Sequence, residues 1–229
     1  MPHDVPDASV RTVEPESRRD LPALRVSSLC HRSRNYRELR RCGGFVDEHF
    51  LNDEQCAGLV ASMRQGDRLP ASVYRKDSDN DIADDIRRVH TTTVPETVAA
   101  VVASRFDALR PLLAAHFETS LETYEGPEYL IYRPGDFFGP HTDDAHEQIA
   151  QRKISVVVFL NTQQVWEGDG GHGDGELVLY GLGAGVDKAG QYVGLPGVAG
   201  SLVAFPADTV HEVLPVAWGE RCAVVGWYR

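Results

Sequence analysis

The chain has 229 residues, a formal net charge of −11, and 42% hydrophobic and 25% charged residues. This length is sufficient to bury a full hydrophobic core and predicts one domain with appendages. Nucleic-acid binding depends on neutralising phosphates with Lys and Arg. The acidic balance and the lack of a basic stripe therefore argue against a nucleic-acid partner.

Localisation is indicated by what the sequence lacks. No apolar run approaches the ~20 residues that a membrane span requires, so we expect no membrane partner. The first thirty residues contain no apolar core of a signal peptide. The four cysteines show neither CxxC spacing nor the density of a disulfide framework. These features predict a cytoplasmic protein with reduced thiols.

Changes in residue pattern divide the chain. Residues 1–42 are polar and rich in Arg, Pro and Ser without a clear period, which predicts an irregular N-terminal arm. We expect residues 43–229 to form a single domain, with a helical and lid part over 43–126 and a β-rich core over 127–229.

A first helix is predicted after Asn52. Asn52 and Gln55 stand at the positions of a capping box, and Gly66 is a suitable C-terminal stop. Three apolar side chains would face the core: Leu59, Val60 and Met63. This helix is interpreted as a supporting element.

Residues 67–92 form the most charged internal stretch and show no helical period. A long structureless run inside a compact domain is either a functional lid or a mobile loop. A solvated loop is the simpler interpretation of its acidic part. The alternative is a lid that contacts substrate through Tyr74, Arg75, Arg87 or Arg88.

A second helix is predicted from Thr93, where Thr93 and Glu96 form a capping-box pair and Pro95 lies in the first turn. Pro111 is expected to kink or divide it. Short β-like runs separated by Gly-rich and Pro-rich links follow, over 128–133, 153–160, 176–181, 201–205, 210–214 and 221–228. Helices followed by many short strands predict an α+β fold, with helices packed on an antiparallel jelly roll of the cupin type.

The candidate site begins with His141 and Asp143. In an extended segment, side chains two residues apart leave the same face, so both can reach one small object. One nitrogen and one carboxylate oxygen are two-thirds of the 2-His-1-carboxylate set of non-haem Fe(II) sites, and His211 is a candidate for the third ligand. A lone H-x-D would more simply be a coincidence in a surface loop.

Other polar and aromatic residues are weaker candidates. We exclude His146 and His172 from the predicted metal ligands. His146 lies in a predicted solvated loop, and His172 lies in a glycine-rich connection that is interpreted as flexible. Trp166 and Trp218 stand in predicted loops near the mouth of the barrel. Each is either a substrate-stacking residue or a simple packing residue.

Several segments in a fixed order carry a family resemblance. They are Y-x-P-G at 132–135, H-T-D at 141–143, KISVVVFLN at 153–161, GELVLY at 175–180, AGSLVAFPADTVHEVLPV at 199–216 and RCAVVGWYR at 221–229. Together, residues 127–229 resemble the Fe(II)- and 2-oxoglutarate-dependent dioxygenases, particularly their prolyl-4-hydroxylase-like branch. The fold that this resemblance implies is a double-stranded β-helix.

The resemblance also implies a ligand set. His141, Asp143 and His211 would hold Fe(II), with 2-oxoglutarate and O2 as the other reactants and ascorbate as an optional stimulant. Arg221 resembles the anchor of the distal carboxylate of 2-oxoglutarate, because a guanidinium grips a carboxylate with two parallel hydrogen bonds. The cofactor pocket would further be lined by Tyr132, Phe159, Val213 and Trp227.

A hairpin linked by residues 215–220 would set Leu214 opposite Arg221. His211 would then lie roughly 10 Å from that pair along the strand. Strict pairing would put the His211 and Arg221 side chains on opposite faces, so this arrangement predicts a one-residue bulge.

The activity implied is oxidation, most simply hydroxylation, of an unactivated C–H bond, with release of succinate and CO2. A small molecule such as an amino acid or a specialised metabolite is the expected substrate. The alternative is a prolyl residue of a peptide or protein. Substrate contacts are assigned to Tyr74, Arg75, Arg88, Trp166 and Trp218. A different class of function is a non-enzymatic, cupin-like metal or ligand binder.

Overall fold

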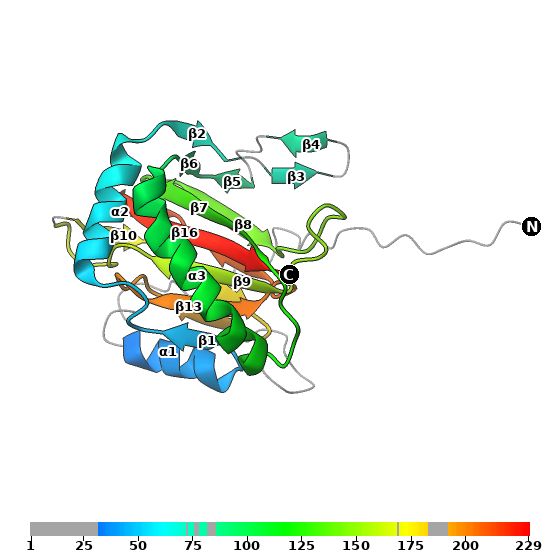
Figure 1. Ribbon diagram of the computed structural model, residues 1–229. Helices are drawn as coiled ribbons and strands as arrows, with labels where there is room; N and C mark the ends of the chain where they lie inside the picture. Colours follow the sequence, from blue (N-terminus) through cyan, green and yellow to red (C-terminus); the bar gives the residue numbers. More distant parts are fainter. Residues whose placement is uncertain (1–31, 72, 76–77, 82–85, 169, 183–191) are drawn as a thin grey trace, which may run out of the picture.

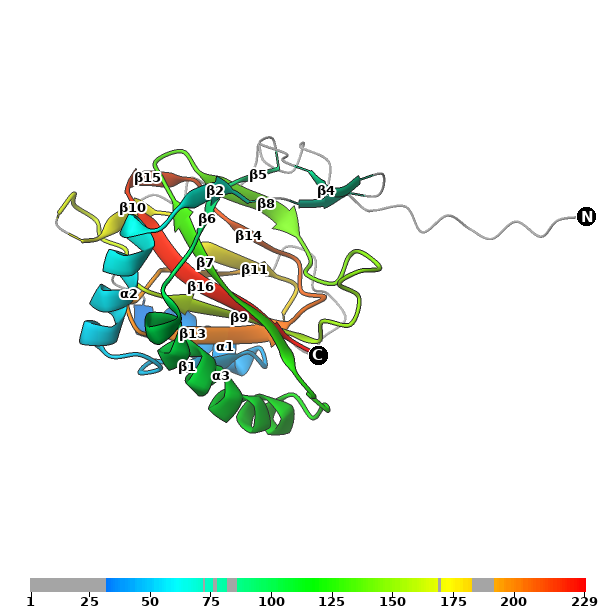
Figure 2. The ribbon, with the colours of Figure 1, turned by 45° about the horizontal axis from the view of Figure 1, so that its top comes forward.

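A computed structural model describes residues 32–71, 73–75, 78–81, 86–168, 170–182 and 192–229. Within this part, two antiparallel sheets face each other, and helices cover the outer face of the larger one (Figures 1 and 2). Among the helices that the structure describes, none is long and apolar enough to cross a membrane.

The larger sheet has seven strands. In spatial order they are β1 (Phe45–Asp47), β13 (Leu202–Pro206), β9 (Ile154–Phe159), β16 (Arg221–Tyr228), β7 (Tyr124–Tyr132), β6 (His90–Thr92) and β2 (Arg68–Pro70). The smaller sheet has five strands. They are β12 (Tyr192–Leu195), β11 (Leu177–Tyr180), β14 (His211–Val213), β8 (Phe137–His141) and β5 (Arg87–Arg88). Two further pairs join β10 (His172–Asp174) to β15 (Val216–Gly219), and β3 (Val73–Arg75) to β4 (Ser78–Asp81).

Two facing sheets with covering helices confirm the predicted jelly-roll fold. Each of the six predicted β-runs overlaps an observed strand. Side chains alternate between two cores, as the period of two requires. In β16, Cys222 and Val224 point toward the helices, whereas Arg221 and Ala223 point toward the space between the sheets. The alternation of one strand therefore directs Arg221 into the interior.

Helix α1 (Arg32–Arg41) corrects the prediction of an irregular arm over 1–42; residues 1–31 of that arm lie outside the described part. Its Tyr36 and Leu39, three residues apart on one face, are buried. The Tyr36 hydroxyl lies 2.8 Å from the Ser201 hydroxyl and donates to the Pro196 carbonyl at 3.1 Å. The arginine-rich composition concealed this short amphipathic helix.

Helix α2 (Asp53–Gln65) has the predicted caps. The Asn52 side chain accepts from the Gln55 amide at 2.8 Å, and the Gln55 side chain accepts from the Asn52 amide at 3.1 Å. Gly66 closes the helix by donating to the Ser62 carbonyl. The three residues predicted to face the core are buried: Leu59, Val60 and Met63.

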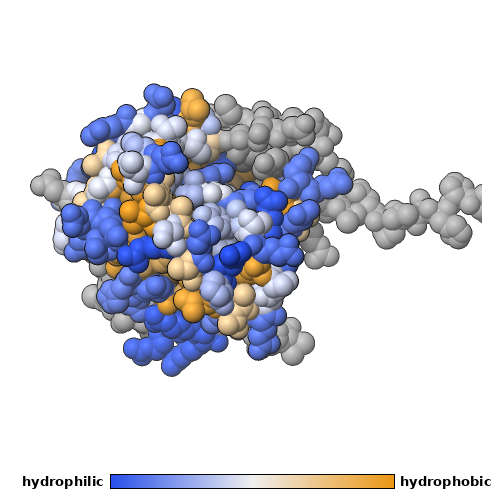
Figure 3. Space-filling model, viewed as in Figure 1, coloured by the Kyte–Doolittle hydropathy of each residue, from blue (hydrophilic) through white to orange (hydrophobic). Residues whose placement is uncertain are grey.

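Helix α3 (Glu96–His116) differs from its prediction at two points. Pro95 occupies the N-cap without a side-chain hydrogen bond, so the capping box predicted from Thr93 is wrong. The Thr93 backbone instead packs closely against Gly66 at the end of α2. Pro111 lies inside a continuous helix and does not divide it. Together α2 and α3 form the face seen in Figure 3, where hydrophilic side chains surround small apolar patches.

The prediction of a structureless run over 67–92 is also wrong for the residues described. Strand β2 pairs with β6, β6 pairs with β7, and β5 pairs with β8. These strands of two or three residues extend the edges of both sheets. Their partners are distant in sequence, so a local pattern does not reveal them.

Candidate active site

Two histidines and one aspartate converge where β8 meets β14. His141 ends β8, Asp143 follows two residues later, and His211 begins β14 directly opposite His141. Their potential ligand atoms all lie within 4.8 Å of one another. His141 Nε2 lies 3.7 Å from Asp143 Oδ1, and His211 Nε2 lies 3.5 Å from Asp143 Oδ2. We call these three residues the triad.

Local hydrogen bonds orient both imidazoles of the triad. His141 Nδ1 lies 2.8 Å from the Gly139 carbonyl, and His211 Nδ1 lies 2.9 Å from the Thr209 carbonyl. A carbonyl only accepts, so each Nδ1 carries a proton, and Nε2 is the nitrogen that faces Asp143 and is available to a metal. The Phe138 ring stacks on His141 with centroids 3.5 Å apart and further fixes that ring. This is the tautomer that a metal ligand requires.

The carboxylate of Asp143 is buried and held from two sides. Ser155 Oγ donates to Asp143 Oδ2 at 2.6 Å, and the Trp227 indole also hydrogen-bonds to the carboxylate. Burial by itself raises the pKa of Asp143, but His211, His141 and these two hydrogen bonds lower it overall. Burial, followed by the proximity of His211, lowers the pKa of His141. An ionised carboxylate beside the neutral His141 imidazole is a protonation state suited to metal binding.

Arg221 lies in the interior at the start of β16 and is only 1% exposed. Its guanidinium carbon lies 5.0 Å from the centre of the Tyr132 ring and 5.4 Å from that of Phe159. Within the described part of the chain, its Nε and Nη2 atoms have no hydrogen-bond partner. Burial lowers its pKa, yet a guanidinium remains charged in proteins. A buried cation with unused donors is suited to an anionic ligand.

The triad and Arg221 open into one cavity. Apart from these residues its walls are mostly apolar, and Arg87 contributes a further charge. The complete lining is Arg87, Leu130, Tyr132, Phe138, His141, Asp143, Ser155, Val156, Val157, Leu177, His211, Val213, Arg221, Val225 and Trp227. The cavity thus offers a metal-binding set and a separate carboxylate-binding group to the same small ligand.

Residues 127–229 match the family described as the 2OG-Fe(II) oxygenase superfamily. This part of the chain, which is somewhat less than half of its length, is similar to that superfamily. Among curated relatives, a PKHD-type hydroxylase of Maricaulis maris is 35% identical over 98 residues, and one of Picosynechococcus sp. is 36% identical over 117 residues. These matches cover 43% and 50% of this chain and 39% and 48% of those proteins. The chain therefore matches less than half the length of these relatives.

Solved structures extend the similarity beyond the superfamily region. A Pseudomonas putida prolyl-4-hydroxylase aligns with a TM-score of 0.65 and 26% identity, over 87% of this chain and 99% of that chain. A prolyl hydroxylase from Trichoplax adhaerens, in complex with a hypoxia inducible factor peptide fragment, aligns with a TM-score of 0.65 and 18% identity. That alignment covers 88% of this chain and 91% of the other, and it shows the shared fold.

The remaining residues expected around the oxygenase cofactor divide between the two ends of the cavity. Tyr132 and Val213 line it, whereas Phe159 stands behind Arg221 and supports it through its ring. Trp227 also lines the cavity, but its hydrogen bond to Asp143 places the indole beside the triad. No sequence pattern distinguishes these positions along the cavity.

The hairpin predicted to join His211 and Arg221 is wrong. Strand β14 pairs with β8 and β11, whereas β16 pairs with β7 and β9 in the other sheet. Strand β15 lies between them in sequence and pairs with β10. His211 and Arg221 therefore lie on strands of different sheets and both line the cavity, and the predicted bulge between their strands does not arise.

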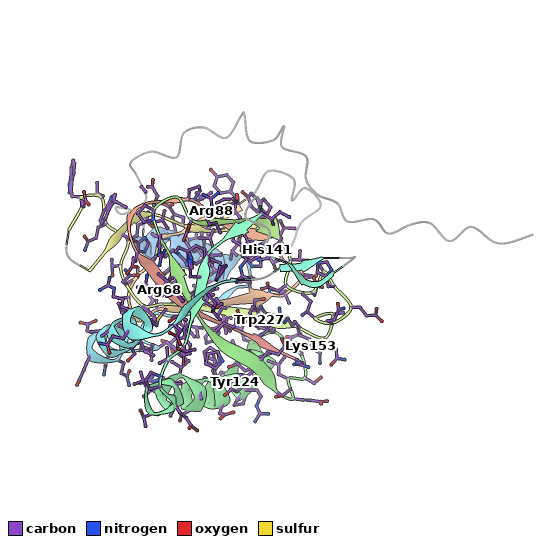
Figure 4. The ribbon with its side chains drawn as sticks, turned by 90° about the horizontal axis from the view of Figure 1, so that it is seen from above. Arg68, Arg88, Tyr124, His141, Lys153 and Trp227 are labelled. Atoms are coloured by element: carbon purple, nitrogen blue, oxygen red, sulfur yellow. The ribbon has the colours of Figure 1, made fainter. Side chains whose placement is uncertain are left out.

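The predicted substrate residues are not gathered at the cavity. Tyr74 and Arg75 lie on β3, but their side chains are outside the described part. Arg88 is exposed beside Phe137, and Trp166 is 83% exposed. Trp218 packs on Gly173 and is absent from the cavity lining. In Figure 4, His141 and Trp227 are labelled nearer the middle of the molecule than Arg88.

Arg87 lines the cavity, although it is not among the five residues assigned to substrate contact from the sequence. Its guanidinium carbon lies 4.7 Å from the centre of the Phe138 ring, which in turn stacks on His141. Neighbouring residues of a strand point to opposite faces. This alternation could have shown that only one of Arg87 and Arg88 faces inward, but not which one.

His172 is fully buried in β10, so its interpretation as part of a flexible connection is wrong. Its Nδ1 lies 2.9 Å from the Asp174 carbonyl. Burial, with Arg221 nearby, lowers the pKa of His172 to about 3 and keeps the ring neutral. His172 belongs to the packing around Arg221, and among the described residues the group that could hold a metal contains only the triad.

Proposed function

We propose that this protein is an Fe(II)- and 2-oxoglutarate-dependent dioxygenase that hydroxylates a prolyl residue in a peptide or protein. The observation that carries the proposal is the placement of the triad and Arg221 in one cavity. The helical part over 43–126 and the jelly roll over 127–229 would act as one domain, because α2, α3 and the seven-stranded sheet share a single core.

The residues present fit the metal of the superfamily. Two neutral imidazoles and one carboxylate leave coordination positions open on a non-haem Fe(II). His141, Asp143 and His211 would hold the ion, while Ser155 and Trp227 fix the carboxylate. Bound Fe(II) supplies the oxidising chemistry that couples conversion of 2-oxoglutarate and O2 into succinate and CO2 to insertion of oxygen into a C–H bond.

The arginine end fits the distal carboxylate of 2-oxoglutarate. The unused Nε and Nη2 donors of Arg221 can form charge-assisted hydrogen bonds with a carboxylate. The Tyr132 and Phe159 rings restrict the guanidinium and exclude water from it. A diacid bound at both ends is held in one orientation, which is the main contribution that protein residues make to this reaction.

The proposal of a prolyl substrate is based on the similar proteins. The similar Pseudomonas putida protein, aligned over nearly its whole length, is a prolyl-4-hydroxylase. The curated matches are hydroxylases, although they are aligned over less than half their length. These similarities support a prolyl substrate better than the free amino acid or specialised metabolite expected from the sequence. Arg87 and Phe138, at the triad side of the cavity, are the residues we assign to substrate contact.

The test is formation of succinate from 2-oxoglutarate by the purified full chain with Fe(II), in the presence of proline-containing peptides. A parallel panel contains free amino acids and other small metabolites. We expect a peptide to gain one oxygen atom from labelled O2 in proportion to succinate. Oxidation of a small molecule alone would overturn the prolyl assignment. A folded protein that binds metal but never converts 2-oxoglutarate would be a non-enzymatic binder.

The control for this test is His141→Ala. Loss of one triad nitrogen should abolish both succinate formation and oxygen incorporation, because the metal-binding set is then incomplete. Succinate formation that persists in this variant would indicate a contaminating oxygenase or a different site.

A further inference from the structure

One buried side chain, that of Asn161, contacts the backbone on both sides of Arg221. Asn161 is 6% exposed and lies just beyond the end of β9. Its Nδ2 donates to the Glu220 carbonyl at 2.7 Å, and its Oδ1 accepts from the Cys222 amide at 2.9 Å. The second Nδ2 hydrogen is directed to the Gly170 carbonyl at 3.1 Å.

This side chain continues the sheet where the main-chain pairing ends. In the pairing of β9 with β16, Phe159 is opposite Ala223, and the Leu160 amide then donates to the Cys222 carbonyl. If the antiparallel register of β9 and β16 continued for two more residues, residue 161 would lie opposite Arg221. The carboxamide of Asn161 thus provides one donor and one acceptor to the two peptide groups that flank Arg221. An amide side chain has both groups, as a peptide group does.

The other contacts that hold the backbone around Arg221 are weaker than those of Asn161 or lie on the opposite edge of β16. Strand β7 pairs with Arg221 through Tyr132 on the opposite edge of β16. The Glu220 side chain forms ion pairs with Arg64 at 3.0 Å and Arg68 at 2.8 Å, and these pairs are partly open to solvent. Such pairs contribute little to stability, whereas buried hydrogen bonds are costly to lose.

The orientation of Arg221 depends strongly on this backbone. Within the described residues, its Nε and Nη2 atoms have no hydrogen-bond partner, so the guanidinium is placed by its backbone and by the Tyr132 and Phe159 rings. A small rotation of the strand would therefore move the donors away from a bound carboxylate. We propose that Asn161 is the positioning residue of the 2-oxoglutarate site, acting through the backbone of Arg221. This inference rests on the proposed function.

The test compares Asn161→Ala and Asn161→Asp with a control on β16, the strand that carries Arg221, namely Tyr228→Phe. Aspartate retains an acceptor for the Cys222 amide but has no donor for the Glu220 carbonyl. The control removes the buried hydrogen bond from the Tyr228 hydroxyl to the Phe106 carbonyl, on the helix side of β16. Calorimetry would give the affinity for Mn(II), and then the affinity for 2-oxoglutarate at saturating Mn(II).

We expect both Asn161 variants to bind 2-oxoglutarate roughly 10-fold to 100-fold more weakly, as when other supporting residues of a site are removed. Their Mn(II) affinity should be unchanged, because the triad lies at the other end of the cavity. Tyr228→Phe should lower the melting temperature without altering 2-oxoglutarate affinity. If Asn161→Ala fails to fold, Asn161→Asp carries the measurement.

Two results would overturn the inference. One is wild-type affinity for 2-oxoglutarate in a folded Asn161 variant. The other is parallel weakening in Tyr228→Phe, which would mean that any loss of stability has the same effect. Failure of the proposed function would look different, because the wild-type protein itself would then bind no 2-oxoglutarate.

Discussion

The two ends of the cavity are built in different ways. At the triad, His141 and His211 come from the five-stranded sheet and are oriented by carbonyls only two residues away in sequence. At the other end, Arg221 belongs to the seven-stranded sheet. Asn161, about sixty residues earlier, contacts the backbone on both sides of it. The triad is organised locally, whereas the arginine end is organised by tertiary structure.

The two ends of the cavity also differ in how well their buried charges are paired with polar groups of the protein. The Asp143 carboxylate has polar neighbours in Ser155, Trp227 and two imidazoles. Arg221 is buried more completely, with Nε and Nη2 donors that have no partner in the described residues. A buried charge with unsatisfied donors destabilises the free protein. A ligand carboxylate would offset that cost, so ligand binding should stabilise the arginine end more than the triad end.

The largest expected effect is at the triad. Asp143→Ala removes the only carboxylate of the metal-binding set, and several kcal/mol of stabilisation would be lost with the ion. We expect succinate formation to fall about 10³-fold or more. Asp144→Ala is the control, since Asp144 is adjacent in sequence but is absent from the cavity lining. Comparable losses in both variants would place the metal elsewhere.

The next largest effect is expected at Arg221, and it distinguishes the arginine end of the cavity from the triad. Arg221→Leu should weaken 2-oxoglutarate binding about 10²-fold, because truncating one partner of a buried charge pair costs about 2–5 kcal/mol. Without ligand, the same variant should melt at the wild-type temperature or above it, since it removes an unpaired buried charge. Thermal melts with and without 2-oxoglutarate at fixed Mn(II) measure both quantities. A large loss of stability in the ligand-free variant would show that Arg221 is a structural residue.

A smaller effect is expected from the residue that supports the triad carboxylate. Ser155→Ala removes the 2.6 Å hydrogen bond to Asp143 Oδ2. We expect metal affinity to fall by about 10-fold, whereas 2-oxoglutarate affinity at saturating metal should not change. Ser201→Ala is a matched control, because Ser201 is equally buried but bonds to the Val198 carbonyl and Tyr36. An equal effect of the control on metal binding would contradict this role for Ser155.

The same contrast between local and tertiary organisation explains what could be predicted from the sequence. The capping box of Asn52 and Gln55 and the six β-runs depend on short-range patterns, and the structure confirms them. The convergence of His141 and Asp143 was predicted from their spacing, although Asp143 lies in the turn that follows β8. His211 was a candidate third ligand, and the structure brings it to them by pairing β14 with β8.

What could not be predicted depends on partners that are distant in sequence. Strands β5 and β6 form only by pairing with β8 and β7. The hairpin predicted after His211 failed because β14 and β16 belong to opposite sheets of the jelly roll. Helix α1 is held by Tyr36 contacts to residues about 160 positions later. In each case the decisive contact is tertiary, and no local periodicity indicates it.

The smallest expected effect is at the rim, where Arg87 lines the cavity and the adjacent Arg88 is exposed. Arg87→Ala would remove a cation–π contact with Phe138, which is worth about 0.5–1 kcal/mol at a partly exposed site. We expect the KM for a peptide substrate to rise about 2-fold to 5-fold, with the KM for 2-oxoglutarate unchanged.

Arg88→Ala is the matched control for this rim effect, because it removes the same charge one residue away, from a side chain outside the cavity lining. Initial rates of succinate release at varied peptide concentration would separate the two variants. A rise confined to Arg87→Ala would mean that substrate contacts the triad side of the cavity through this side chain. Equal rises in both variants would instead indicate that the rim attracts substrate through its summed charge, an effect that added salt should weaken.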